Sequence, residues 1–95
     1  MKIGTIVKLK KEMLGNLPGT LGVVFNVYDD FDYPDKLGAQ VIFQNGDYDG
    51  FSIKEQILFL EDVGFIRKYS EYVFKNVIKV SEDFEKGYWG DIWKQ

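Results

Sequence analysis

Residues 44–52, QNGDYDGFS, bring two aspartates, two glycines and two aromatic residues into nine positions. An EF-hand calcium loop needs oxygen ligands at positions 1, 3 and 5, Gly at position 6 and Glu at position 12. Counted from Asn45, the chain offers Asp47, Asp49 and Gly50 in place, but Gln56 stands where the bidentate Glu is needed. Because Asn45-Gly46 is also a strong signal for a type I′ hairpin turn, we interpret the stretch as a tight turn and expect no metal site.

A second group of functional side chains lies in residues 28–35, YDDFDYPD, where carboxylates alternate with aromatic rings. Aromatic rings form a contact platform that loses little entropy on binding, and carboxylates select a partner with a basic surface. The alternative interpretation is a solvated connection whose Phe31 covers a barrel end. The candidate partner-binding residues are Tyr28, Asp29, Asp30, Phe31, Asp32 and Tyr33, together with the neighbouring Tyr48 and Asp49.

Catalytic groups of the common kinds are missing from the sequence. The chain has no His and no Cys, which excludes Ser-His and Cys-His nucleophile pairs and the usual zinc ligand sets. No G-x-x-x-x-G-K phosphate loop occurs either. We therefore expect a protein that is not an enzyme, with no catalytic residue and no cofactor.

The charge balance bears on the class of partner. The formal net charge is −3 and the isoelectric point is about 4.8, whereas nucleic-acid-binding domains usually carry a basic patch. Lys8, Lys10 and Lys11 form the one close group of lysines. No secretory leader and no uninterrupted apolar run of membrane-spanning length is visible, so we expect a cytoplasmic protein without membrane contact.

The first two thirds of the chain have the short alternating patterns of β-strands. Glycine-rich turns separate the apolar runs, which are rich in β-branched and aromatic residues. The expected strands are residues 3–10, 21–29, 39–44, 47–53 and 57–60, with one helical turn at residues 54–56. Five short strands within about sixty residues predict a small barrel or sandwich.

The last third of the chain is typical of an amphipathic helix. Taking Ser70 as the N-cap, residues 71–86 place Val73, Val77, Val80 and Phe84 on one stripe, and Gly87 follows as a C-terminal glycine. An alternative is a sixth strand at residues 72–76 with a helix that starts only at Val77. Residues 61–69 have no firm assignment.

The chain ends in an aromatic tail, residues 88–95, which contains Trp89 and Trp93. These side chains either pack back onto the domain or serve as anchors in a pocket of a partner. Packing is the favoured interpretation, because a domain of this size needs their buried area.

Residues 3–60 resemble Src-homology-3-like small β-barrels, and above all their KOW-type subgroup. Gly4, Val7 and Leu9 match a G-x-x-V-x-V strand, and a G-x-x-G-x-V segment follows at Gly19, Gly22 and Val24. A one-turn helix before a short last strand is also typical of such barrels. Because KOW-type barrels are usually basic and peptide-binding Src-homology-3 domains carry an ALYDY-like signature that is missing here, the resemblance transfers no ligand class.

These observations predict a single domain over residues 1–95 of the mainly β class. It comprises a five-stranded Src-homology-3-like barrel at residues 3–60, a C-terminal amphipathic α-helix at residues 70–87 and the aromatic tail. The expected role is that of a protein-interaction module. The alternatives are a KOW-like nucleic-acid or ribosome-associated module that uses Lys8, Lys10 and Lys11, and a phage- or immunity-type blocking protein.

Overall fold

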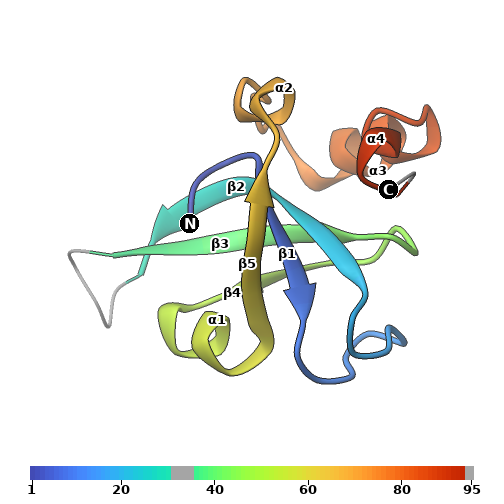
Figure 1. Ribbon diagram of the computed structural model, residues 1–95. Helices are drawn as coiled ribbons and strands as arrows, with labels where there is room; N and C mark the ends of the chain where they lie inside the picture. Colours follow the sequence, from blue (N-terminus) through green and yellow to red (C-terminus); the bar gives the residue numbers. More distant parts are fainter. Residues whose placement is uncertain (31–35, 94–95) are drawn as a thin grey trace.

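The fold was analysed in a computed structural model, which describes residues 1–30 and 36–93. A five-stranded antiparallel sheet forms the centre of the molecule, and short helices lie on both of its sides (Figure 1). The elements in chain order are β1 (Thr5–Leu9), β2 (Leu21–Asp29), β3 (Leu37–Phe43), β4 (Tyr48–Phe51), α1 (Ile53–Phe59), β5 (Leu60–Phe65), α2 (Arg67–Ser70), α3 (Val77–Glu85) and α4 (Gly90–Trp93). The expectation of a mainly β chain with five strands is confirmed.

The strands pair in the order β4-β3-β2-β1-β5, and every pair is antiparallel. Among the described residues, β4 pairs only with β3 and β5 pairs only with β1, so the sheet is open. The closed barrel expected from the sequence is therefore not observed. The edge strand β5 carries the charged residues Glu61 and Asp62, which disfavour pairing of this edge with a strand of another chain.

Each face of the sheet carries a buried core, which explains the density of apolar residues in β1, β2 and β3. One core lies under α2, α3 and α4, and the other lies on the opposite side, with α1 near it (Figure 1). The first core is made of Ile6, Val23, Phe25, Ile42, Tyr69, Val80, Trp89 and Ile92, and the second of Val7, Leu9, Val24, Ala39, Val41, Phe43, Phe51 and Leu60.

A β-bulge in β2 redistributes its side chains between these two cores. The register with β3 shifts between Val24 and Asn26, so that Phe25 is the inserted residue. Regular alternation predicts that Val27 shares the face of Phe25, but Val27 packs against the second core together with Val24.

The segment after β4 differs from the sequence prediction because a capping box starts a longer helix there. The Ser52 hydroxyl accepts a hydrogen bond from the backbone N–H of Glu55, and the Glu55 side chain accepts one from the N–H of Ser52. The helix continues to Phe59, so the strand predicted at residues 57–60 is wrong. The last strand is β5, which begins at Leu60 and includes residues that had no assignment.

The C-terminal helix starts later than predicted. Ser70 does not act as an N-cap, because its hydroxyl donates to the carbonyl of Arg67 and closes α2. The cap of α3 is Asn76, whose Oδ1 accepts from the N–H of Lys79 at 2.8 Å. The alternative start at Val77 is thus confirmed, while residues 71–76 form neither helix nor strand.

The tryptophans of the tail pack inward. Trp89 is completely buried in the first core, and Trp93 packs against the same core from α4. No helix in the described part of the chain has the length and apolar character needed to span a membrane.

The turns are also distributed differently from the prediction. Between β3 and β4, Asn45 has no positive φ and Gly46 has φ +89°, so the predicted type I′ turn is wrong. The hairpin is a type I turn followed by a left-handed glycine, closed by the bonds Gly46 N to Phe43 O and Phe43 N to Asp47 O, both 2.8 Å. A two-residue turn with positive φ at both central positions does occur, at Leu14 (φ 51°) and Gly15 (φ 74°).

Candidate functional site: a tyrosine face on the sheet

Two of the candidate residues, Tyr28 and Tyr48, lie on one face of the sheet. Tyr28 pairs with Gly38 of β3, and Tyr48 of β4 pairs with Ile42 of β3. Paired residues share a face of the sheet, and alternate residues of β3, such as Gly38 and Ile42, also share a face. Both rings are partly accessible, with 38% of Tyr28 and 39% of Tyr48 exposed.

A flat polar strip separates the two tyrosines. It consists of Asn26 of β2, Gln40 of β3 and Gly50 of β4, which stand side by side in the register. The Asn26 amide donates to Oε1 of Gln40 at 2.8 Å, which links β2 and β3 within the strip. We call Tyr28, Asn26, Gln40, Gly50 and Tyr48 the tyrosine face.

Two glycines allow the Tyr28 ring to lie across the neighbouring strands. A Cβ atom at Gly38 would come within 2.3 Å of Cε2 of Tyr28, and one at Gly50 would come within 3.2 Å of its hydroxyl. The ring therefore extends from β2 over β3 toward β4, and its outer side faces solvent. A side chain at position 38 would therefore displace the ring, whereas one at position 50 would need only a small shift of the hydroxyl.

Negatively charged side chains lie near Tyr28. Burial and then the carboxylates of Glu55, Asp30 and Asp49 raise the pKa of the Tyr28 phenol above its usual range. Asp29, the last residue of β2, is exposed next to Tyr28 in the chain, and strand alternation directs its side chain to the opposite side of the sheet. An accessible aromatic ring in a negative field is a favourable place for a cation.

Asp30 has a structural position rather than an exposed one. Only 7% of it is accessible, and its Oδ2 accepts a hydrogen bond from the backbone N–H of Ile53 at 2.9 Å. This bond ties the end of β2 to the first turn of α1, where a carboxylate also complements the helix dipole. Asp30 contributes charge near Tyr28, but it is too buried for direct contact with a partner.

Tyr48 and Asp49 point to opposite sides of β4, as the alternation of the sequence predicts. Tyr48 makes an edge-to-face contact with Phe25, with ring centroids 6.4 Å apart, whereas Asp49 pairs with Val41 of the other face. One carboxylate oxygen of Asp49 accepts from the N–H of Gly50 at 2.8 Å. The Asp49 side chain is therefore not part of the tyrosine face, although its charge acts on Tyr28.

The remaining candidates, Phe31, Asp32 and Tyr33, lie outside the described residues. Within the described part of the chain, no cluster of three carboxylates suited to a metal ion is formed. Asp47, which the calcium-loop pattern needs as a ligand, is bonded to the side chain of Asn45 within the hairpin.

Sequence reasoning missed Asn26, Gln40 and Gly50 as members of the surface. Asn26 and Gln40 are polar residues inside otherwise apolar strands, and this interruption of the pattern was the available signal. Their juxtaposition depends on the register between β2 and β3 after the bulge, which the sequence does not specify.

The lysines of the nucleic-acid alternative are partly engaged within the chain. The Lys10 ammonium donates to the carbonyl of Ile57 at 2.9 Å, and the Lys11 ammonium lies 5.9 Å from the centroid of the Phe59 ring. Lys8 is exposed on β1.

The chain matches no protein-family model, and comparisons with curated proteins and with solved structures also find no match.

Proposed function

We propose that this chain is a cytoplasmic, non-enzymatic protein-interaction module that contacts a partner through the tyrosine face. The partner presents Lys or Arg side chains, which stack on Tyr28 and Tyr48 and pair with the surrounding carboxylates. No cofactor takes part in this function. The observation that carries the proposal is the pair of partly exposed rings on one sheet face, one of them in the negative field of Glu55, Asp30 and Asp49.

The Src-homology-3-like, KOW-type assignment of residues 3–60 is part of the same proposal. The strand order, with β1 between β2 and β5, and the short helix α1 before the last strand support it. Proteins with small barrels of this kind serve many functions, so the fold itself does not select the ligand. The formal net charge of −3 makes a phosphate-binding surface the weaker alternative.

Charge reversal at Asp29 tests the proposal, because this exposed carboxylate follows Tyr28 directly in the chain and adds to the negative charge at this end of β2. The probe is a fluorescent twelve-residue peptide of alternating Lys and Ser with one central Tyr, titrated at low and at moderate salt. We expect Asp29→Lys to weaken binding about tenfold, as expected for replacing an attraction of up to about 1 kcal/mol by a comparable repulsion.

The matched control is Glu85→Lys, which changes the net charge equally at the exposed end of α3. This variant should bind nearly as well as the parent chain. Equal weakening in both variants would show a nonspecific charge effect and contradict the proposal. Binding of a twelve-nucleotide RNA with a steep salt dependence, and not of the peptide, would instead favour the nucleic-acid alternative.

A further inference from the structure

A shallow pocket lies beside α1, on the side of the helix that faces the first and last strands. Its volume is about 400 Å³, and it opens widely to solvent. It is lined by Met1, Lys10, Lys36, Ile53, Gln56, Ile57, Leu60 and Asp62. None of these residues belongs to the tyrosine face, so the pocket is a separate feature of the surface.

The pocket has an apolar wall that the fold leaves exposed. Ile53 and Ile57 are one helical turn apart on α1, and 67% of Ile57 is accessible to solvent. Leu58 beside it is also exposed. Neighbouring aliphatic side chains in a concave site gain free energy when a partner's apolar side chain covers them.

The rim of the pocket carries two lysines, Lys10 and Lys36, against one carboxylate, Asp62. Lys10 is held in place because its ammonium donates to the carbonyl of Ile57 near the end of α1, at 2.9 Å. An ammonium has three donors, so Lys10 keeps donors for a ligand. A cationic rim in a chain of net charge −3 runs against the overall field and selects an anionic group.

We propose that this pocket binds an acidic, apolar peptide segment of a partner protein. One or two Leu or Ile side chains of the segment pack against Ile53 and Ile57, and flanking Asp or Glu carboxylates pair with Lys10 and Lys36. The pocket is too open to enclose a small molecule, because sites for such ligands bury most of the ligand surface. An extended peptide, whose remaining surface stays in solvent, fits this shape.

Three blocked tetrapeptides separate the apolar and ionic contributions to binding. They are acetyl-Asp-Leu-Leu-Asp-amide, its Asn-Leu-Leu-Asn analogue without charge and its Asp-Ser-Ser-Asp analogue without apolar side chains. Each is titrated into the full chain, and amide chemical shifts are followed by NMR. We expect the first peptide to shift the amides of Ile53, Gln56, Ile57 and Lys36, and both analogues to bind at least about fivefold more weakly.

Variants of the chain locate the binding site. Lys36→Glu should weaken binding of the first peptide about fivefold, and Ile57→Ser about tenfold through the lost apolar contact. Lys54→Glu and Val73→Ser are the matched controls, because Lys54 is a lysine of α1 outside the pocket and Val73 is 72% exposed elsewhere. Both controls should leave the affinity unchanged.

Three results would overturn the proposal. They are the absence of shifts at millimolar peptide, equal binding of all three peptides, and equal effects of Lys36→Glu and Lys54→Glu. Asp29 is not a pocket residue, and Asp29→Lys adds positive charge near Lys36, so this variant should not weaken binding of the acidic peptide. A failed test of the pocket therefore does not contradict the proposal for the tyrosine face, and a failed test of the tyrosine face does not contradict the proposal for the pocket.

Discussion

At the scale of single residues, Leu14 has the least favourable backbone conformation of the described chain. It is the one described residue other than glycine with a positive φ, 51°, and its side chain is exposed. Its carbonyl accepts from the side chains of Asn16 at 3.3 Å and Asn45 at 3.2 Å, which ties the turn to the β3–β4 hairpin. The left-handed region costs a residue with a Cβ atom about 1 kcal/mol, and Asn tolerates it better.

Replacing Leu14 by Asn should therefore stabilise the domain by about 0.5 to 1 kcal/mol. Urea unfolding followed by tryptophan fluorescence measures the change. The control is Leu17→Asn, at an exposed leucine of the same loop whose φ is not positive, and this variant should bring no gain. A lower unfolding midpoint for Leu14→Asn than for the parent chain would refute the interpretation.

The sequence could specify the turn at residues 44–47 only in part. Asn45-Gly46 does mark the β3–β4 connection, but the φ values there show a different turn type. Nothing in the residue types of Leu14-Gly15 favours the conformation that the structure shows at Leu14, because leucine is not among the residues that prefer it. Two backbone hydrogen bonds between Met13 and Asn16 close that turn, and the bond from Asn45 ties it to the β3–β4 hairpin.

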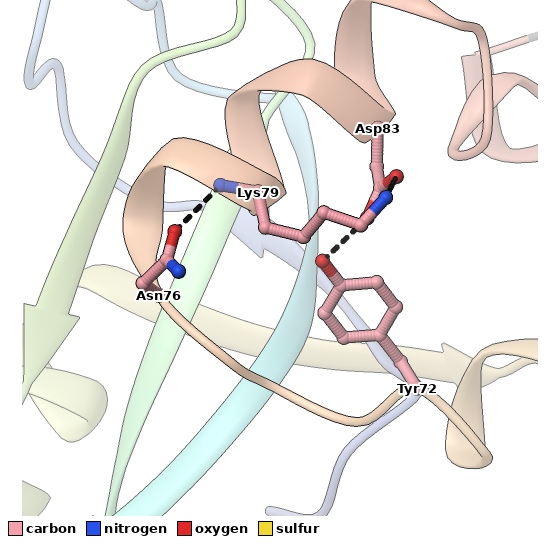
Figure 2. Close-up of polar contacts among 4 residues, drawn as sticks. All are labelled: Tyr72, Asn76, Lys79 and Asp83. Atoms are coloured by element: carbon pink, nitrogen blue, oxygen red, sulfur yellow. Dashed lines mark hydrogen bonds and ion pairs between the residues drawn. The ribbon is translucent and has the colours of Figure 1, made fainter.

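At the scale of elements, α3 is attached to the preceding segment through one largely buried carboxylate. Asp83 Oδ2 accepts from the Tyr72 hydroxyl at 2.7 Å, and Oδ1 accepts from the Lys79 ammonium at 2.7 Å; Figure 2 shows the group with the cap Asn76. Burial alone would raise the pKa of Asp83, but the bonds from Lys79 and Tyr72 outweigh it, so its pKa lies below the usual value. Burial and the same bond raise the pKa of Tyr72.

Asp83→Asn should destabilise the domain by about 1 to 2 kcal/mol at pH 7, because it removes a charged acceptor from two donors. A carboxylate with a lowered folded-state pKa contributes stability above its unfolded pKa of about 3.9, and this contribution is lost as pH falls through the folded value. The cost of Asp83→Asn should therefore shrink below about pH 4.

The matched control for Asp83 is Asp91→Asn, which removes an ion pair to Lys68 in which both side chains are more than half exposed. Urea unfolding at pH 7 and pH 3 should show no change for this variant, since exposed pairs contribute little. An Asp83→Asn cost that is the same at both pH values would contradict the assigned role of the carboxylate.

The sequence predicted strands better than helices, for a physical reason. Alternation of apolar residues follows from a buried sheet face, and β2 was predicted with its observed bounds. Helix starts depend on which polar side chain reaches a free N–H group, and Ser52, Ser70 and Asn76 are equally good caps by type. Only the tertiary structure shows that Ser70 bonds backward to Arg67, whereas Asn76 caps α3.

At the scale of the whole molecule, the C-terminal third supplies part of the hydrophobic core. Tyr69, Val80, Trp89 and Ile92 cover one face of the sheet, and each is fully buried. The apolar residues of both cores could be predicted from their types, but the assignment of each to a face depends on the bulge at Phe25 and on the late start of α3. The same contacts place the tyrosine face beyond the covered part of the sheet, next to Phe25.

Photo-crosslinking from the tyrosine face tests the central claim, contact with a protein, most directly. A benzophenone side chain replaces Tyr48 or, as the control, the exposed Val73, and both chains are irradiated in extract of the cells that make the protein. We predict a discrete adduct from position 48 that protease removes, that nuclease leaves intact and that Asp29→Lys reduces. A nuclease-sensitive adduct, or the same adducts from positions 48 and 73, would contradict the account.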